Sequence, residues 1–286
     1  MRKLTCSHPL TKTKVSSVAY IDTLEMFCRH PPSDVVERLQ RLCGRAWPKP
    51  CNDRHGHFCG WRIIANQPRE DALRLLQAIK DHHKGVLCRL DVSVDYLTSD
   101  PDQLFALAED VRRCALLRWR PKGWMSDEGG TTRWVYFAGR RRPNRNFLLY
   151  ADRPSKTGGT ANVLHLELRF LRAAVIRRGG YEDPASLIGL DPSVPFSTNI
   201  KLVDFDPLPR LSKKVRKTVQ YYRRDPASEF SENYYETIPD RVEKLWARLD
   251  MHRAQGYQNI FRDAFSGTPG FSLPVPEKLT FFTPSG

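Results

Sequence analysis

The chain has 286 residues, and 40% of them are hydrophobic, which is enough for one large domain with its own core. Lys and Arg total 46 against 32 Asp and Glu, so the formal net charge is +14 and a polyanionic partner is favoured, most often a nucleic acid. No stretch approaches the roughly 20 apolar residues of a membrane span. The basic N-terminus lacks the apolar core of a signal peptide, so we expect a cytoplasmic protein without a membrane partner.

Cysteine spacing and phosphate-binding motifs exclude several other classes. The seven cysteines are irregularly spaced and include no Cys-x-x-Cys pair, which argues against a zinc site or a disulfide framework and predicts free thiols. The sequence contains no Walker loop, no Gly-x-Gly-x-x-Gly and no Gly-x-Ser-x-Gly. ATPase, dinucleotide-binding and serine-hydrolase functions are therefore poorly supported.

Hydrophobic periodicity predicts alternating strands and helices in the first half of the chain. Strands are predicted at residues 17–27, 58–68 and 85–95, and helices at 33–42, 69–83 and 100–119. The middle of the chain is richer in strands, which are predicted at 131–139, 146–152 and 163–170. Helices dominate beyond residue 171, and the clearest are predicted at 211–224 and 239–255. The expected fold class is α+β: a mixed, mainly antiparallel sheet of about six strands, with helices on one face and a helical C-terminal part.

Two of these strands carry unusual rows of ionisable side chains. In "VLHLELRF" (163–170), His165 and Glu167 alternate with leucines, and in "RLDVSVD" (89–95), Asp91 and Asp95 share one face. Outward charges on a half-exposed strand are usually only solvated, but Asp is disfavoured in strands, and clustered carboxylates repel one another. A divalent cation would offset the repulsion, and carboxylates with an imidazole suit Mg²⁺ or Mn²⁺. We therefore predict a metal site on an open face of the sheet, with these four residues as candidate ligands.

Two basic segments are candidate contacts to DNA phosphates. "GRRRPNR" (139–145) joins two predicted strands, and "RLSKKVRKTVQYYRR" (210–224) holds seven basic residues and no acidic one. Each could be a solvated surface, but clustered arginines also grip phosphates, and a basic helix favours nucleic acid. The candidate DNA-binding residues are Arg140, Arg141, Arg142, Arg145, Lys213, Lys214, Arg216, Lys217, Arg223 and Arg224.

Tyr221 and Tyr222 lie at the end of the predicted basic helix. A tyrosine there can pack against the domain or stack on a base. Near a metal, its phenolate could instead attack a DNA phosphorus and leave a covalent phosphotyrosine. Adjacent helical residues point about 100° apart, so at most one of the two would face the metal. Tyr181, Tyr234 and Tyr235 are rivals that spacing does not exclude.

The order of these motifs resembles the rolling-circle replication initiators of plasmids and filamentous-type phages. The resemblance rests on "YIDTLEM" (20–26), "RLDVSVD", "WVYFAGRRRPNRNFLLYADRPSK" (134–156) and "VLHLELRF", and covers roughly residues 18 to 170. The sequence departs from the family pattern at Ala151 and Arg153, and at His165, where an arginine is usual.

The resemblance implies a site-specific DNA endonuclease and strand transferase that nicks and rejoins one strand. Asp91 and Glu167 would be metal ligands, with Asp95 and His165 beside them. Tyr150 and Lys156 would lie near the scissile phosphate, and Tyr221 or Tyr222 would be the nucleophile. The partner would be single-stranded or hairpin origin DNA, with a host helicase and a second copy of the chain as further candidates.

We expect three segments: a sheet-based nuclease or DNA-binding domain at 1–170, a helical part packed on it at 171–265, and an extended tail at 266–286. Two alternatives remain open from the sequence. One is a non-catalytic DNA- or RNA-binding protein on the same scaffold. The other is a transposase-like or relaxase-like enzyme with the same chemistry and a different biological cycle.

Overall fold

The computed structural model describes residues 16–97, 104, 108, 111, 115–117, 121–128, 131–138, 144–156, 161–191 and 193–202. Its main sheet consists of β1 (Ser16–Cys28), β2 (Arg45–Asn52), β3 (Phe58–Asn66), β4 (Val86–Leu97), β6 (Pro121–Glu128), β7 (Thr131–Ala138), β8 (Arg145–Pro154) and β9 (Asn162–Phe170). Two short strands, β5 (Ala115–Leu117) and β10 (Ile200–Leu202), pair separately. The helices are α1 (Val35–Leu42), α2 (Glu70–His83), α4 (Ala173–Arg178), α5 (Ser193–Asn199) and the 3₁₀ helix η2 (Pro184–Leu187).

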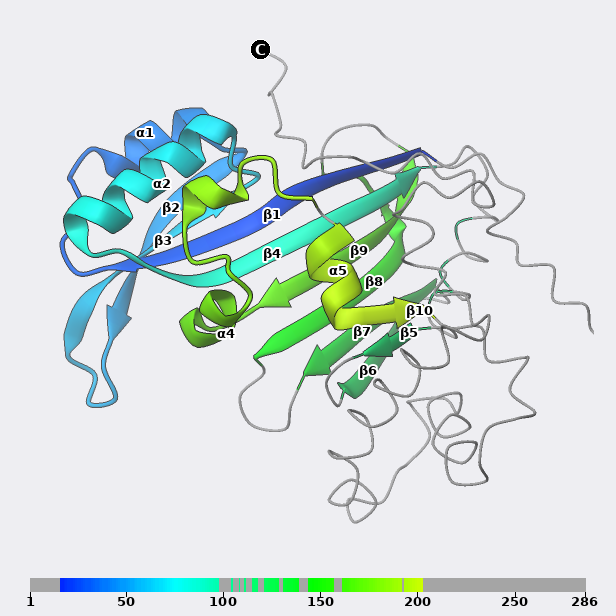
Figure 1. Ribbon diagram of the computed structural model, residues 1–286. Coiled ribbons are helices and arrows are strands. Elements are labelled where there is room, and N and C mark those ends of the chain that lie inside the picture. Colours follow the sequence, from blue (N-terminus) through cyan, green and yellow to red (C-terminus); the bar gives the residue numbers. More distant parts are fainter. Residues whose placement is uncertain are drawn as a thin grey trace, which may run out of the picture.

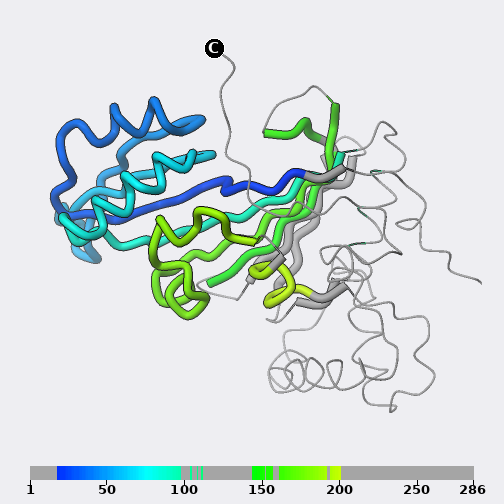
Figure 2. The backbone as a smooth tube through the Cα atoms, turned by 45° about the horizontal axis from the view of Figure 1, so that its top comes forward, coloured from blue at the N-terminus to red at the C-terminus, as the bar shows by residue number. Residues whose placement is uncertain are grey.

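The eight strands of the main sheet run in the order β2-β3-β1-β4-β9-β8-β7-β6 (Figure 1). Every neighbouring pair is antiparallel. The α+β class is confirmed, but among the described residues the sheet has eight strands instead of about six. The long strands β1 and β4 run side by side through its middle (Figure 2).

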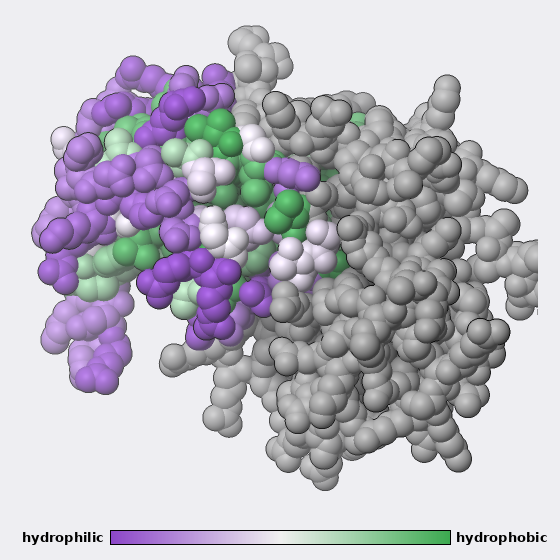
Figure 3. Space-filling model, in the orientation of Figure 1, coloured by the Kyte–Doolittle hydropathy of each residue, from purple (hydrophilic) through white to green (hydrophobic). Residues whose placement is uncertain are grey.

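The helices cover one face of the sheet, as predicted (Figure 1). That face carries the apolar alternate residues of β4 and β9, and Val92, Val94 and Leu166 are fully buried there. From the helices, Leu39 and Leu73 join the same hydrophobic core. The outer surfaces of α1 and α2 are hydrophilic, as Figure 3 shows. Because alternate residues of a strand point to opposite faces, the ionisable residues of β4 and β9 point away from the helices.

A β-bulge in β1 changes which of its side chains join them. Ile21 pairs with Val92 and Thr23 with Asp91, so Asp22 is one extra residue in β1. Ile21 and Leu24 both belong to the core, although they are three positions apart. The two residues between them, Asp22 and Thr23, are therefore both turned to the face opposite the described helices.

Three local predictions differ from the structure. Strand β2 was not predicted, because Pro48 and Pro50 are typical of loops and occur in strands mainly at sheet edges. Strand β6, which begins at Pro121, was not predicted either. The helix predicted at 100–119 is wrong at its end, because residues 115–117 form β5, which pairs with β10.

Beyond β9, the described residues continue the core. Val175, Ile176, Leu187 and Phe196 are buried in it, and Lys80 of α2 forms an ion pair with Asp183. The predicted helices at 211–224 and 239–255 and the tail at 266–286 lie outside the described residues. The five described cysteines are free thiols. No helix in the described part is both long and apolar enough to span a membrane.

Candidate metal centre

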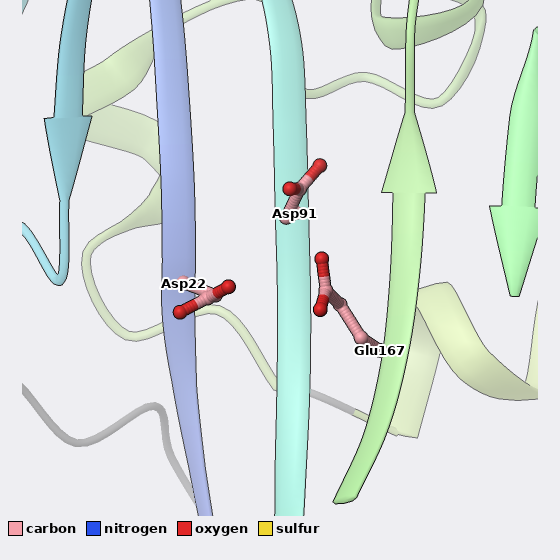
Figure 4. Close-up of side chains that lie close together, drawn as sticks. All are labelled: Asp22, Asp91 and Glu167. Atoms are coloured by element: carbon pink, nitrogen blue, oxygen red, sulfur yellow. The ribbon is translucent and has the colours of Figure 1, made fainter. Parts of the chain in front are cut away.

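Three carboxylates from three neighbouring strands meet on the face opposite the helices. Asp22 of β1, Asp91 of β4 and Glu167 of β9 each offer one oxygen, and these oxygens lie within 4.8 Å of one another (Figure 4). The sheet order places β4 between β1 and β9, and the register pairs Asp91 with Thr23 on one side and with Arg169 on the other. We call Asp22, Asp91 and Glu167 the acidic triad.

Basic side chains surround the acidic triad. Arg89 donates from its Nε atom to both oxygens of Asp91, at 3.0 and 2.9 Å. Arg169 donates to Glu167. The Nζ atom of Lys156 lies 2.6 Å from an oxygen of Asp22 and 3.8 Å from one of Glu167. Buried carboxylates are tolerated when they are paired in this way, because the partners offset the loss of hydration.

A loop residue completes the surroundings of Asp22. Gln67 donates from its Nε2 atom to the Asp22 carboxylate at 3.0 Å, and its backbone N–H donates to the Asp22 carbonyl at 2.9 Å. Gln67 has a positive φ of 42°, a conformation that is uncommon outside glycine. The residue after β3 is thus held against the bulge that carries Asp22.

His165 connects the triad to a second buried acid, Asp95. Its Nδ1 atom lies 2.6 Å from Asp95, and its Nε2 atom lies 3.2 Å from Glu167. Tyr20 donates to Asp95 at 3.2 Å, and the ring of Tyr150 stacks on the imidazole with 4.4 Å between ring centroids. The imidazole therefore bridges two carboxylates and fixes the orientation of Glu167.

Burial and neighbouring charges shift the pKa values of these groups. Burial, followed by the nearby charge of Glu167, raises the pKa of Asp91 to about 8 despite the Arg89 contacts. Burial acts in the same direction on Glu167, but hydrogen bonds from His165 and Arg169 outweigh it and lower the pKa of that carboxyl. Burial alone would lower the pKa of His165, yet its contacts with Asp95 and Glu167 raise it. Asp91 and Glu167 thus favour one proton or one cation between them.

The donor set of the triad fits a hard divalent cation. It consists only of carboxylate oxygens, the ligands that Mg²⁺ and Mn²⁺ prefer, and contains none of the thiolates or imidazoles typical of zinc. An ionised carboxylate has about four lone-pair positions, so the hydrogen bonds to these acids leave positions for a metal. The three carboxylates could therefore hold a divalent cation between them.

The structure brings together several residues that the sequence singled out. Asp91 and Glu167 both belong to the triad, with Lys156 beside them and Tyr150 over His165. Asp95 and His165 bind each other next to the triad and are not members of it. The prediction of an open polar face is wrong at these side chains, because Asp91, Asp95 and Glu167 are 0% exposed.

Other predicted residues lie elsewhere. Arg145 is the first residue of β8, where it pairs in register with Phe170. Tyr181, a rival nucleophile, is buried and packs against Phe170, so it serves the core. The remaining candidates lie outside the described residues: Arg140, Arg141, Arg142, Lys213, Lys214, Arg216, Lys217, Tyr221, Tyr222, Arg223, Arg224, Tyr234 and Tyr235.

Sequence reasoning missed Asp22. The segment "YIDTLEM" was noted, but no metal-binding role was assigned to its aspartate. A signal was present, because Ile21 and Leu24 are separated by two polar residues, which breaks the alternation of a regular strand. Such a break in an otherwise apolar face indicates a bulge, and bulges often redirect side chains beside active sites.

Similarity to known proteins is found in the structure and not in the sequence. No protein family and no curated protein matches the sequence. Among solved structures, a rolling circle replication initiator protein from Geobacillus stearothermophilus is similar, with a TM-score of 0.44 and 11% sequence identity. The similar region covers 72% of this chain and 97% of the other.

Proposed function

We propose that this protein is a metal-dependent endonuclease that nicks one DNA strand at a specific site to initiate rolling-circle replication of a phage or plasmid. The observation that carries the proposal is the acidic triad with Lys156 beside it. Three buried carboxylates and an ammonium on one sheet face form a site for a divalent cation and a phosphate. The net charge of +14 favours a nucleic-acid substrate, and the order of the sequence motifs favours replication initiators over other nucleases.

In this proposal, Asp22, Asp91 and Glu167 hold the cation, which as a Lewis acid would polarise the scissile phosphate. Lys156, whose ammonium lies 2.6 Å from Asp22 and is partly exposed, turns to a non-bridging oxygen of the phosphate. Asp95 and His165 keep Glu167 in place through the hydrogen bond at 3.2 Å. Arg89 holds Asp91 in position, Arg169 holds a second oxygen of Glu167, and both limit the repulsion between the two carboxylates.

The nucleophile in this proposal is Tyr221 or Tyr222. Its phenolic oxygen attacks the phosphorus, a bond forms between that oxygen and the phosphorus, and the bond from phosphorus to the 3′ oxygen breaks. The phenolic proton leaves to solvent, and the 3′ oxygen departs as a hydroxyl after taking up a proton. The 5′ end stays on the protein as a phosphotyrosine, so the energy of the phosphodiester is kept for rejoining. The free 3′-OH primes DNA synthesis.

The decisive experiment selects for a covalent product. A pool of single-stranded oligonucleotides with random sequence is incubated with the protein and Mn²⁺, and the DNA that stays bound in detergent is sequenced. We expect an adduct whose DNA carries a common sequence and whose peptide maps to Tyr221 or Tyr222. Glu167→Gln should abolish the adduct, because it removes a charged ligand while it keeps the size of the side chain.

Asp71→Asn is the matched control, because it removes a carboxylate that is exposed on α2, on the other face of the sheet. This variant should form the adduct at the normal rate. An adduct that forms equally well in EDTA or with Glu167→Gln would contradict the proposal. Salt-sensitive DNA binding without any adduct would instead favour the non-catalytic binding protein.

A further inference from the structure

The edge strand β2 places a row of basic and aromatic side chains on the same face as the acidic triad. Residues directly opposite each other in antiparallel strands share a face. Arg45 pairs with Asn66, which pairs with Thr23, and Thr23 pairs with Asp91. In the same way, Trp47 pairs with Ile64, Ile64 pairs with Glu25, and Glu25 pairs with Arg89. Arg45, Trp47 and the next alternate residue, Lys49, therefore form one row, which we call the β2 row.

The β2 row is accessible. Arg45 and Lys49 are exposed and Trp47 is half-buried. The guanidinium of Arg45 lies over the indole of Trp47, 4.9 Å from the ring centroid. Strand β2 contains no acidic residue. The row thus combines the positive charges of Arg45 and Lys49 with the indole ring of Trp47. One face of that ring is covered by the guanidinium of Arg45.

The side chains between the β2 row and the triad include more basic than acidic groups. Glu25 lies between them, and its two oxygens are bound by Arg62 and Arg89, at 3.1 and 2.9 Å. Strands β2 and β4 are three strand spacings apart, roughly 14 Å. A chain of phosphates could cross this distance without meeting an unpaired acid.

A simpler explanation covers only part of the row. Edge strands often carry Lys and Pro, which prevent another strand from pairing with them. Lys49, Pro48 and Pro50 fit that role. Protection of the edge does not explain why Trp47 lies on an accessible face with Arg45 over its ring.

We propose that the β2 row binds the single-stranded DNA that flanks the scissile phosphate. A base stacks on Trp47 and displaces the guanidinium of Arg45, which then binds a phosphate, as does Lys49. Base stacking on an aromatic ring together with backbone phosphate contacts is how proteins hold single strands without reading a sequence. The inference rests on the proposed function, in that the bound strand leads to the acidic triad.

The test measures binding alone, in EDTA, so that no cleavage is needed. A short fluorescein-labelled single-stranded oligonucleotide is titrated with the full chain, and fluorescence anisotropy gives Kd at several salt concentrations. Trp47→Ala should weaken binding by at least about 5-fold, the lower end for loss of one stacked base. Trp47→Phe should restore most of that loss, because a phenyl ring still stacks.

The charged residues are tested by the salt dependence. Arg45→Gln with Lys49→Gln should lower the slope of log Kd against log salt by about 1.4, for two lost phosphate contacts on a single strand. The control pair, Arg41→Gln with Arg74→Gln, removes the same charge from exposed residues of α1 and α2 on the other face. The control should leave the slope unchanged. Both pairs are at the surface and should fold normally.

Two outcomes would overturn the inference: a Trp47→Ala protein that binds the oligonucleotide as tightly as the wild type, or equal slope changes in the two charge pairs. These failures differ from failure of the proposed function. If wild-type protein forms adducts and the β2 row variants keep their affinity, only the inference fails. If the variants lose affinity but no adduct ever forms with Mn²⁺, only the proposed function fails.

Discussion

Asp22 is the residue that makes this a site of three carboxylates. Without it, only Asp91 of β4 and Glu167 of β9 would remain. Its side chain lies on the same face as Tyr20, and Lys156 and Gln67 hold it there. The bulge lets Thr23 share that face and returns Leu24 to the core. Asp22 thus adds a third carboxylate to the site.

We expect Asp22→Asn to fold normally but to bind Mn²⁺ at least about 10- to 100-fold more weakly, since even outer-shell partners of metal sites have effects of that size. Asparagine keeps the shape and the contact with Gln67 but loses the charge. Mn²⁺ affinity can be measured by electron paramagnetic resonance. Asp71→Asn serves again as the control, and equal Mn²⁺ affinity in both variants would exclude Asp22 as a ligand.

His165 should make the stability of the metal-free protein depend on pH. Its contacts with Asp95 and Glu167 raise its pKa in the folded state. The charged form is therefore favoured by folding: its stabilisation is complete below the ordinary pKa of about 6.5 and is lost as pH rises through the folded-state value. We expect His165→Gln to cost about 3–5 kcal/mol at low pH, the usual cost of breaking a buried pair, and less at high pH.

This expectation can be checked by urea unfolding in EDTA at about pH 6 and about pH 9, on either side of the ordinary histidine pKa. His82→Gln, an exposed position near the end of α2, is the control and should change stability little at either pH. A His165→Gln deficit that is the same at both pH values would mean that the imidazole is neutral in the folded protein.

At the scale of the elements, the ribbon of β2 and β3 depends on close packing near its base. Gly60 has a φ of +150°, and a Cβ there would lie 2.8 Å from the ring of Phe27 and 3.0 Å from the carbonyl oxygen of Cys28. Gly56, at the turn of the ribbon, has a φ of +87° and open space around it. The two glycines thus share an unusual backbone but differ in their surroundings.

We expect Gly56→Ala to cost about 1–2 kcal/mol, the penalty for a left-handed backbone with a Cβ. Gly60→Ala should cost about 1–3 kcal/mol more, because the added methyl must displace Phe27. Thermal or urea unfolding measures both. If Gly56→Ala were the more destabilising change, Gly60 could not be packed as closely against Phe27 of β1 as described above.

The same elements show what the sequence could predict. The alternation in "RLDVSVD" and "VLHLELRF" correctly assigned the apolar and polar faces of β4 and β9, because period two needs only local information. The break in alternation after Ile21 signals the bulge, but it could not reveal that Asp22 lies beside Asp91 and Glu167. The edge strand that holds Pro48 and Pro50 and the burial of Asp91 were equally hidden. These features depend on which strands become neighbours, and no residue encodes that locally. The site was predicted in two of its three carboxylates for this reason.

At the scale of the whole molecule, a metal should link three strands that are far apart in the sequence. Because the triad joins β1, β4 and β9, a bound cation stabilises the folded sheet and not the unfolded chain. We expect Mn²⁺ at 100 times its Kd to add about 2.7 kcal/mol to the unfolding free energy. At the same Mn²⁺ concentration, the gain in Asp22→Asn should fall to about 1.4 kcal/mol or less, because its Kd is at least about tenfold higher.

The stabilisation by Mn²⁺ should also depend on pH. Since the pKa of Asp91 is raised to about 8, a metal must displace its proton at lower pH. The apparent affinity should fall about tenfold for each pH unit below that value and stay constant above it. Melting temperatures recorded with and without Mn²⁺ across this range would show it, and a shift that does not vary with pH would contradict a proton on Asp91.

The position of β9 in the chain has a consequence for biosynthesis. A ribosome makes Asp22 and Asp91 long before it reaches Asn162–Phe170, the strand that contains Glu167. An unfinished polypeptide therefore lacks one side of the centre and the neighbour strand that β4 needs. Under the proposed activity, a copy translated only as far as β8 could not cut DNA, and competence would arise only after β9 has been made.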